Sequence, residues 1–498
     1  MKTNLKALAD GSGTCETTGP VLGTKPVLAL LMRLLWAAAL ALPAFRAQAG
    51  VVFTSLYSFT GAIDGASPRA GLVQGSDGNF YGTTYEGGTN GGYGTVFKIS
   101  ANGVLTSLHS FAGATDGANP WWAALAQGSD GDFYGTTYAG GAYTNWLGQG
   151  AGTVFKISAD GALTSLHSFG AKLYQGQSVD GTNPQAGLVQ GSDGNFYGTT
   201  EFGGNFCGSV FKISANGALA SLFWFSGGGS GGYPVAGLVQ GSDGNFYGET
   251  SGGGSDVFGT VFEFSANGNA VTNPLSWRFS YGDDGASPEG GLVQGSDGSF
   301  YGTTFYSAVG PEGPYGYGTV FQIGTTGALT SLHSFSGAKD GAYPQAGLVQ
   351  GRDGCFYGTT AGGGTSNSGT AFKISRDGVL TSLHSFAGSD GADPQAGLVQ
   401  GSDGSFYGTT SSGGTGKSGT VFRLTLVPEP PSLTITPCGA NVVLTWPTNA
   451  LGFNLQSTTN LVSPAVWTTN SPGPVVVNGQ NTVTNPMSGT QQFYRLSQ

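Results

Sequence analysis

Charged residues are scarce in this chain of 498 residues, at 9% of the total, and there are only 22 prolines and four cysteines. Little charge combined with 31 Phe and 20 Tyr is the opposite of a disordered composition. Collagen is excluded because the glycines follow no three-residue period. No long segment has a 3.6-residue apolar period, which excludes a helical bundle. A formal net charge of −10 disfavours a polyanionic partner, so no nucleic-acid binding is expected.

The cysteines indicate neither a metal site nor a disulfide framework. Cys15, Cys207, Cys355 and Cys438 stand singly along the chain, without the paired spacing of zinc ligands. We therefore expect no metal at cysteine, and a fold stabilised by its core, which a chain of this length can bury.

An apolar run near the start predicts a secretory signal. Leu34 to Phe45 forms the apolar core, and Ala47-Gln48-Ala49 is a small-x-small cleavage pattern before Gly50. Met32-Arg33 supplies a start and a basic flank, so residues 1–49 are interpreted as a signal region whose true start is Met32. The alternative is a retained anchor over residues 27–45, which Arg33 would interrupt. We expect a protein that is secreted or at the bacterial cell surface, with no membrane span in the mature chain.

The chain is rich in glycine, with 92 residues, and glycine recurs within a sequence motif that is repeated seven times. The copies of GLVQGSDGNFYGTT place their Phe at Phe80, Phe133, Phe196, Phe246, Phe300, Phe356 and Phe406. Each unit holds four short segments rich in Val, Phe, Tyr and Thr, which predict strands; in the first unit they are 70–75, 79–84, 94–100 and 104–111. Asp-Gly and Asn-Gly links predict tight hairpins, so each unit is an antiparallel meander. Repeated meanders of this kind build a β-propeller.

The order of the segments favours a closed ring over a β-helix. The mature chain begins with a strand of the fourth type, residues 51–59, and the repeats end with a strand of the third type, residues 419–426. Pairing these two would complete the last sheet and remove an exposed edge. We therefore predict an all-β fold: a seven-bladed β-propeller over residues 50–426, closed by the N-terminal strand, in a monomeric protein.

These repeats resemble the GloVer-type tandem repeat. The phrases GLVQGSDGxFYGTT, GTVFKIS and LTSLHSF carry the resemblance over residues 51–426. The repeat is described in exported bacterial proteins with a choice of C-terminal sorting segments, so the resemblance implies export and a repetitive β architecture. It implies no catalytic residue and no ligand.

A separate module follows a Pro-rich linker at residues 427–431. Residues 432–498, with VVLTWP and FNLQSTTNL, are similar to a small fibronectin-III or immunoglobulin-like β-sandwich, with Trp446 in its core. The strands predicted here are 432–436, 442–446, 453–457, 475–478 and 493–496.

Loops of variable length, which share one face of a meander propeller, are where we expect any ligand. Flat aromatic side chains on this face suit stacking on sugar rings. Trp121 and Trp122 stand where three other copies have Gln-Ala, and the candidate ligand-binding residues are Trp121, Trp122, Tyr143, Trp146, Tyr174, Phe202 and Phe206. In the alternative interpretation, the two tryptophans only fill space between adjacent blades.

Carboxylates and histidines also recur once per unit. An Asp-Gly-x-x-Pro motif supplies Asp64, Asp116, Asp180, Asp284, Asp340 and Asp390. We interpret these as turn-capping groups, while Asp116 and Asp180 stay candidates for ligand contact and a convergent Ca²⁺ site stays open as the one possible cofactor. The hairpin residues Asp77, Asp130, Asp193, Asp243, Asp297, Asp353 and Asp403 are interpreted as turn formers. One position of the fourth strand holds a histidine in four units and an aromatic residue in the others. The histidines are His109, His167, His333 and His384, and the aromatic residues are Tyr57, Phe223 and Phe279. We interpret this position as packing area.

Function is the least determined property of this sequence. We expect an exported, non-catalytic binding or structural module that recognises a carbohydrate or surface polymer. The alternatives are a scaffold or adhesion protein of the cell envelope, and a propeller hydrolase or lyase. The enzyme is disfavoured because we find no catalytic residues: the loop face carries no His, and Arg69 is its one arginine near a candidate loop, too few for sialidase chemistry.

The segment order makes a testable prediction. Deletion of residues 51–59 should lower the stability of the whole repeat region, because the last sheet loses its outer strand. Thermal unfolding should show one transition at a lower temperature; an unchanged main transition with loss of a small local one would contradict it.

Overall fold

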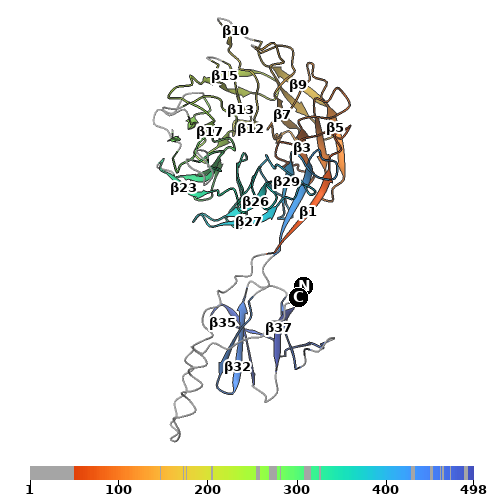
Figure 1. Ribbon diagram of the computed structural model, residues 1–498, viewed down its shortest axis with the longest axis vertical. Coiled ribbons are helices and arrows are strands. Elements are labelled where there is room, and N and C mark those ends of the chain that lie inside the picture. Colours follow the sequence, from red (N-terminus) through yellow and green to blue (C-terminus); the bar gives the residue numbers. More distant parts are fainter. Residues whose placement is uncertain are drawn as a thin grey trace. The chain divides into compact units, whose positions relative to one another are not determined.

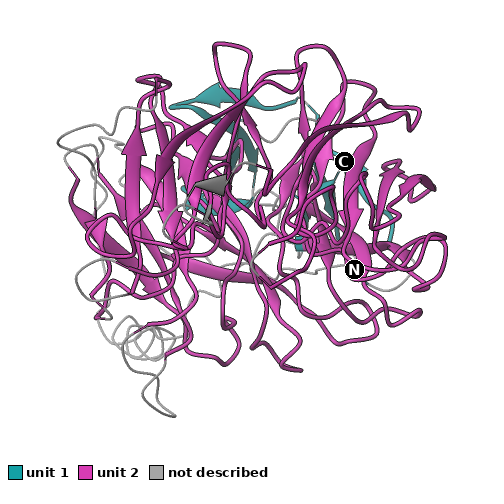
Figure 2. Cartoon of the chain, turned by 90° about the horizontal axis from the view of Figure 1, so that it is seen from above, with its two compact units in different colours: residues 1–50, 427–498 teal, residues 51–426 magenta. Residues whose placement is uncertain are grey.

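The computed structural model describes residues 50–145, 147–171, 173–174, 177–203, 206–253, 258–267, 277–280, 282–307, 316–324, 327–427, 432–448, 453–459, 461, 465–471, 473–486 and 492–497. The chain divides into two compact units, one of residues 51–426 and one of residues 1–50 with 427–498 (Figure 2). Within the described residues, no helix is long and apolar enough to cross a membrane.

The described part of residues 51–426 contains seven four-stranded antiparallel sheets, here sheets 1 to 7 in chain order, which follow one another around a common centre (Figure 1). Sheet 1 consists of β2 (Val73–Gln74), β3 (Phe80–Thr84), β4 (Thr95–Ile99) and β5 (Leu105–Ser110). Sheets 2 and 3 repeat this order as β6 (Ala126–Gln127), β7 (Phe133–Thr137), β8 (Thr153–Ile157) and β9 (Leu163–Ser168), then β12 (Val189–Gln190), β13 (Phe196–Thr200), β14 (Ser209–Ile213) and β15 (Leu219–Trp224). A short ribbon of β10 (Leu173–Tyr174) and β11 (Gln177–Ser178) lies in the connection between them.

Sheets 4 to 6 have the same strand order. They are β16 (Val239–Gln240), β17 (Phe246–Thr250), β18 (Thr260–Phe264) and β19 (Trp277–Arg278); β20 (Val293–Gln294), β21 (Phe300–Thr304), β22 (Thr319–Ile323) and β23 (Leu329–Ser334); and β24 (Val349–Gln350), β25 (Phe356–Thr360), β26 (Thr370–Ile374) and β27 (Leu380–Ser385). The prediction of an all-β chain of propeller-like repeats is confirmed.

Sheet 7 combines the two ends of the repeat region. It contains β28 (Val399–Gln400), β29 (Phe406–Thr410) and β30 (Thr420–Val427), and β1 (Gly50–Ser58) lies at its edge beside β30. The amide of Phe59, just beyond β1, donates to the carbonyl of Gly419 at 2.9 Å. The N-terminal strand therefore has the pairing that the order of the segments predicts.

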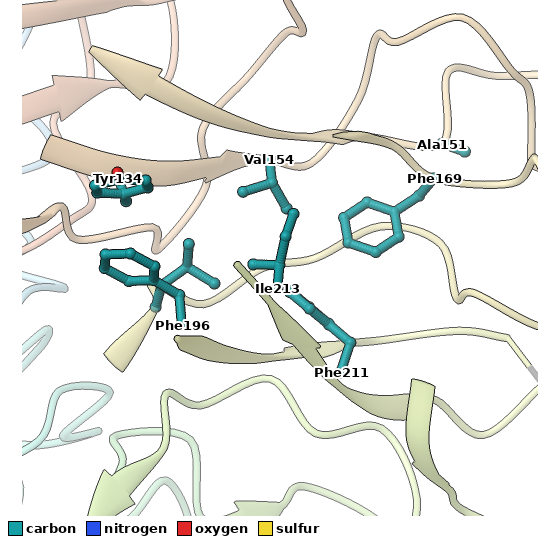
Figure 3. Packing of buried hydrophobic residues seen from close by; sticks show 8 residues of the cluster. Tyr134, Ala151, Val154, Phe169, Phe196, Phe211 and Ile213 are labelled. Carbon is teal, nitrogen blue, oxygen red and sulfur yellow. The ribbon is translucent and has the colours of Figure 1, made fainter. Parts of the chain in front are cut away.

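An aromatic pair joins each sheet to the next. Tyr134 of sheet 2 lies beside Phe196 of sheet 3 (Figure 3), and the two rings stack with centroids 3.9 Å apart. Tyr407 of sheet 7 stacks on Phe80 of sheet 1 at 4.0 Å. The other pairs are Tyr81–Phe133, Tyr197–Phe246, Tyr247–Phe300, Tyr301–Phe356 and Tyr357–Phe406, at 3.9–4.2 Å. The consecutive Phe-Tyr of the repeat thus contacts both neighbouring sheets.

The hairpin aspartates support these rings. The Tyr134 hydroxyl donates to Asp130 at 2.7 Å, which satisfies a polar atom on a buried side chain. Asp77 accepts from the Tyr81 hydroxyl and from the amide of Asn79, two residues on. The interpretation of this aspartate series as turn formers is confirmed.

Polar contacts between sheets also repeat. The Thr136 hydroxyl donates to the carbonyl of Ala186 in the segment leading into sheet 3, and the amide of Ser129 donates to the Gln190 side chain. From sheet 7 to sheet 1, Thr409 donates to Ala70 at 3.1 Å and the Ser402 amide donates to Gln74 at 2.8 Å. The junction of the last sheet with the first uses the same bonds as the internal junctions.

The C-terminal unit contains two sheets, with strand orders β31-β32-β36-β35 and β34-β33-β37. The strands are β31 (Thr434–Cys438), β32 (Asn441–Pro447), β33 (Asn454–Thr458), β34 (Thr468–Thr469), β35 (Val475–Val477), β36 (Gln480–Pro486) and β37 (Phe493–Ser497). Its core contains Leu444, Trp446, Leu455 and Val483. The core role of Trp446, 1% exposed, is confirmed, while β34 and β36 were missed by the sequence prediction.

The inner segments of the sheets approach closely enough to need glycine. A Cβ added at Gly187 would lie 2.2 Å from the carbonyl oxygen of Ala124 in the preceding sheet, whereas one at the equivalent Gly237 would have its nearest neighbour at 3.9 Å.

This difference generates a matched pair of variants. We expect Gly187→Ala to lower the free energy of unfolding by about 1–3 kcal/mol through overpacking, and Gly237→Ala to leave it unchanged or slightly raised. Urea unfolding of the full chain measures both. Equal effects would contradict the close approach at Gly187.

Candidate functional site

A cavity of about 310 Å³ lies where the segments leading into the inner strands of the seven sheets meet. Most of its lining residues are apolar and belong to the Ala-Gly-Leu of the repeats, for example Ala186, Gly187 and Leu188. The charged side chains among its described lining residues are Arg69 and Glu289. The volume falls at the lower end of the range for small-molecule sites.

The segments that lead into the sheets beside the cavity share an unusual backbone conformation. The residue before the proline that leads into each sheet has a left-handed φ of 52–60°: Ser67, Asn119, Asn183, Tyr233, Ser287, Tyr343 and Asp393. Its amide donates to a loop of the preceding sheet, as from Asn183 to the carbonyl of Ala151 at 2.7 Å. Residues other than glycine rarely adopt such a φ, and these contacts hold the entering chain in it.

The residue after this proline varies from unit to unit. In chain order it is Arg69, Trp121, Gln185, Val235, Glu289, Gln345 and Gln395. A second variable position, directly after the second strand, supplies Tyr85, Tyr138, Glu201, Ser251, Phe305, Ala361 and Ser411. Sequence analysis missed most of these residues, although variation at two positions of an otherwise uniform repeat is a signal that could have found them.

The two tryptophans have different places. Trp121 occupies the position after proline, and Trp122 is an additional residue, because five steps separate Pro120 from Leu125 where four are usual. The expectation that both replace Gln-Ala is wrong in this respect. The amide of Trp122 donates to the carbonyl of Gln185, and its side chain lines the cavity.

Arg69 lies within the aromatic cluster. Its guanidinium carbon is 4.3 Å from the ring centroid of Tyr85 and 4.6 Å from that of Trp121. Trp121 also meets Tyr85 edge to face at 4.7 Å, Tyr138 at 5.5 Å and Trp122 at 6.1 Å. The structure therefore brings Trp121 and Trp122 together, with both side chains only partly buried.

A polar network borders this cluster. The Gln185 side-chain amide donates to Glu201 at 2.5 Å. Burial raises the pKa of Glu201 above its ordinary value, against the hydrogen bonds from Gln185 and Tyr138. Burial, together with the charge of Glu201, raises the pKa of Tyr138 to about 12.

Acceptor groups come from the sheets farther along the chain. Burial raises the pKa of Glu289 to about 7, against a hydrogen bond from Gln345. The Gln395 amide nitrogen donates to Asp393 at 2.9 Å, while its carbonyl oxygen is buried and has no hydrogen-bond partner among the described residues.

Glu249 replaces the threonine that links sheets at the other junctions. It is fully buried, and one carboxylate oxygen accepts from the amide of Gly291 at 2.9 Å while the other has no described partner. Gly291 has a φ of +81°, and Gly290 stands where other units have alanine. Burial raises the pKa of Glu249 to about 8, against the hydrogen bond from Gly291.

Among the other predicted aromatic residues, those with a described side chain do not line the cavity. Tyr143 and Phe206 are exposed, and Phe202 packs edge to face on Tyr233 at 6.0 Å. Tyr174 belongs to β10, without a described side chain, and Trp146 lies outside the described residues.

The repeated aspartates and histidines form pairs. His109 Nε2 lies 3.1 Å from Asp116, and His167 Nε2 lies 3.2 Å from the fully buried Asp180. His333–Asp340 and His384–Asp390 repeat this contact, and Tyr57 donates to Asp64 at 3.0 Å. The interpretation of the histidines as packing area alone is therefore incomplete.

Two further expectations change. In sheet 4 the position of the histidines belongs to Trp277, not Phe279, since Trp277 pairs with Val261 as His109 pairs with Val96.

Each repeated aspartate binds groups near its own loop, and no group of three or more His, Cys, Asp or Glu among the described residues could hold a metal ion. A Ca²⁺ site shared by these aspartates thus has no support.

A family model described as the Gloeobacter/Verrucomicrobia repeat matches residues 44–172, 149–308 and 275–436. No curated protein matches the sequence.

Solved structures give distant likenesses. A gluconolactonase from Xanthomonas campestris has 14% identity and a TM-score of 0.38, over 78% of this chain and 93% of its own. A copper-bound fungal alcohol oxidase of the AA5 family has 14% identity and a TM-score of 0.47, over 90% and 92%. A protein of unknown function from Dyadobacter fermentans has 9% identity and a TM-score of 0.40, over 76% and 99%. With TM-scores below 0.5, these likenesses carry no inference about the chemistry of this chain.

The buried Glu249 generates a prediction about pH. Its folded pKa of about 8 lies above the ordinary value of 4.5, so the folded state keeps a proton that the unfolded chain loses as pH rises from 4.5 to 8. Stability should therefore fall over this window, on the order of 2–4 kcal/mol from this group. Glu249→Gln should remove most of that loss.

Urea unfolding from pH 5 to 9 provides the measurement. Glu289, whose pKa is also raised, should leave a smaller slope of the same sign that Glu289→Gln removes. Glu263→Gln, at a partly exposed site on β18, is the control. A wild-type stability that rises between pH 5 and 8 would refute the prediction.

Proposed function

The chain belongs to the Gloeobacter/Verrucomicrobia repeat family, and we propose that it is an exported, non-catalytic protein that binds carbohydrate at the cavity mouth. The mouth is defined here by Arg69, Tyr85, Trp121, Trp122 and Glu289. Export follows from the signal pattern of residues 34–49, which lie outside the described residues.

The proposal includes a closed seven-bladed propeller for residues 51–426. Its support is the junction of sheet 7 with sheet 1, where the Tyr407–Phe80 stack and the bonds to Ala70 and Gln74 repeat those of the other junctions. A ring of this kind holds the variable residues around one axis, so side chains from several sheets can face a single ligand.

The aromatic cluster at the mouth is the observation that carries the carbohydrate proposal. Trp122 lines the cavity and Trp121 packs beside it, and neither indole N–H has a hydrogen-bond partner among the described residues. Indole rings offer a flat apolar surface together with a polar group, which matches the apolar face and hydroxyl edge of a sugar ring. Glu289 and Gln395 add acceptors on the cavity wall.

The same lining supports a non-catalytic role. Among the described lining residues, Glu289 is the one carboxylic acid, whereas glycoside hydrolysis ordinarily uses a pair of carboxyl groups around the scissile bond.

The C-terminal unit, proposed to be fibronectin-III- or immunoglobulin-like, would act as a spacer or attachment module. An envelope protein as partner is the alternative, which a pull-down from envelope fractions tests.

A glycan array tests the proposal. The wild-type protein should bind a limited set of glycans, and the double variant Trp121→Ala/Trp122→Ala should bind them at least tenfold more weakly because the stacking surface is removed. Trp224→Ala, at an exposed indole on the edge strand β15, is the matched control and should bind like the wild type.

Two outcomes would reject the proposal. One is the absence of glycan binding by the folded wild-type protein. The other is undiminished binding by the double variant, which would place any glycan site away from the cavity mouth.

A further inference from the structure

Arg69 is a cation without an anionic partner in the part of the chain that the structure describes. It lines the cavity, and its guanidinium is held against Tyr85 and Trp121 at 4.3 and 4.6 Å. Its Nε atom is buried and makes no hydrogen bond within that part. A buried donor without an acceptor costs about 1–3 kcal/mol, so the fold retains Arg69 here at the expense of stability.

The aromatic contacts fix the plane of this guanidinium. Stacking on two rings restricts the long side chain, which leaves its planar set of N–H donors preorganised. Arg presents these donors in a fork that matches the two oxygens of a carboxylate. A ligand carboxylate would therefore meet a positioned partner at Arg69.

The neighbouring groups have the same hydrogen-bonding character. The indole nitrogens of Trp121 and Trp122 are also buried donors without described acceptors. Trp121 is in contact with Arg69, and Trp122 follows it at a centroid distance of 6.1 Å. Unsatisfied donors thus gather on the side of the cavity formed by sheets 1 and 2.

Acceptors come from other sheets. Glu289 of sheet 5 and Gln395 of sheet 7 line the same cavity, and the Gln395 carbonyl oxygen is a buried acceptor without a described donor. A guanidinium at one part of a small cavity and the carboxyl group of Glu289 at another complement a molecule with one carboxylate and several hydroxyls.

We propose that the cavity mouth binds a single sugar-acid residue, such as a terminal hexuronate, with its carboxylate on Arg69 and its hydroxyls directed to Glu289. This inference rests on the proposed carbohydrate function and specifies its ligand class. One carboxylate in a cavity of about 310 Å³ is also compatible with a net charge of −10, which would repel an extended acidic polymer.

Paired sugars that differ only at carbon 6 test this assignment. Titration calorimetry on the full chain compares methyl glucuronide with methyl glucoside, and the galacto pair in the same way. We expect at least one uronide to bind at least tenfold more tightly than its neutral partner, and this preference to decrease with salt. Acetate at the same concentration should not bind measurably, because it lacks the hydroxyls.

Variants at Arg69 identify the group responsible. Arg69→Gln should abolish the acid preference, and Arg69→Lys should restore only part of it because an ammonium lacks the fork. Arg352→Gln, in the hairpin turn of sheet 6, is the control and should keep the preference. A thermal unfolding transition like that of the wild type shows that each variant is folded.

The possible results separate the two proposals. Equal binding of acidic and neutral partners, or an acid preference that survives in Arg69→Gln, overturns the sugar-acid assignment and leaves carbohydrate binding intact. Acetate binding as tight as that of the uronide also overturns it, because the site would then recognise any carboxylate. No binding of any glycan by the folded wild type rejects the proposed function itself.

Discussion

The stack of a tyrosine on the phenylalanine of the next sheet is the contact on which the rest of residues 51–426 depends. It recurs at every junction, including that of sheet 7 with sheet 1, and such pairs contribute about 0.5–1.5 kcal/mol each beyond their buried area. The tyrosine hydroxyl binds the hairpin aspartate of its own sheet, so the stack also fixes the turn. Strands of five residues, too short to be stable alone, become parts of one packed assembly.

Uniform junctions free other positions to vary. Since the Phe-Tyr pair and the threonine and glutamine bonds set the spacing of the sheets, the side chains of the residue after proline and of the residue after the second strand take no part in these repeated contacts. The seven units use them for different side chains, from Arg69 and Trp121 to Val235 and Glu289. A scaffold of repeated sheets thereby supports an asymmetric cavity, with donors on one side and acceptors elsewhere on its wall.

The repeated phrase was sufficient to predict the strands, the hairpins and the place of β1, because alternating apolar residues and Asp-Gly turns act locally. It was not sufficient for contacts that join separate segments. The His109–Asp116 pair needs the fourth strand and the following loop to be seen together, and the left-handed φ of residues such as Asn183 arises from a bond to the preceding sheet. At the site, Trp121 and Trp122 were found by their aromatic character. Arg69 was noted in the sequence only as an argument against sialidase chemistry, since its stacking on Tyr85 depends on the meeting of two loops.

The exchange of threonine for Glu249 has a consequence for assembly. Its carboxyl group needs the amide of Gly291, which is presented only by a glycine with φ of +81°. The other junctions offer a carbonyl instead, as Ala186 does to Thr136, and a carbonyl cannot donate the hydrogen bond that the Glu249 oxygen accepts. Near-identical units could otherwise pair with the wrong neighbour or with a second molecule. One junction with its own chemical complementarity distinguishes the correct succession of sheets from its permutations.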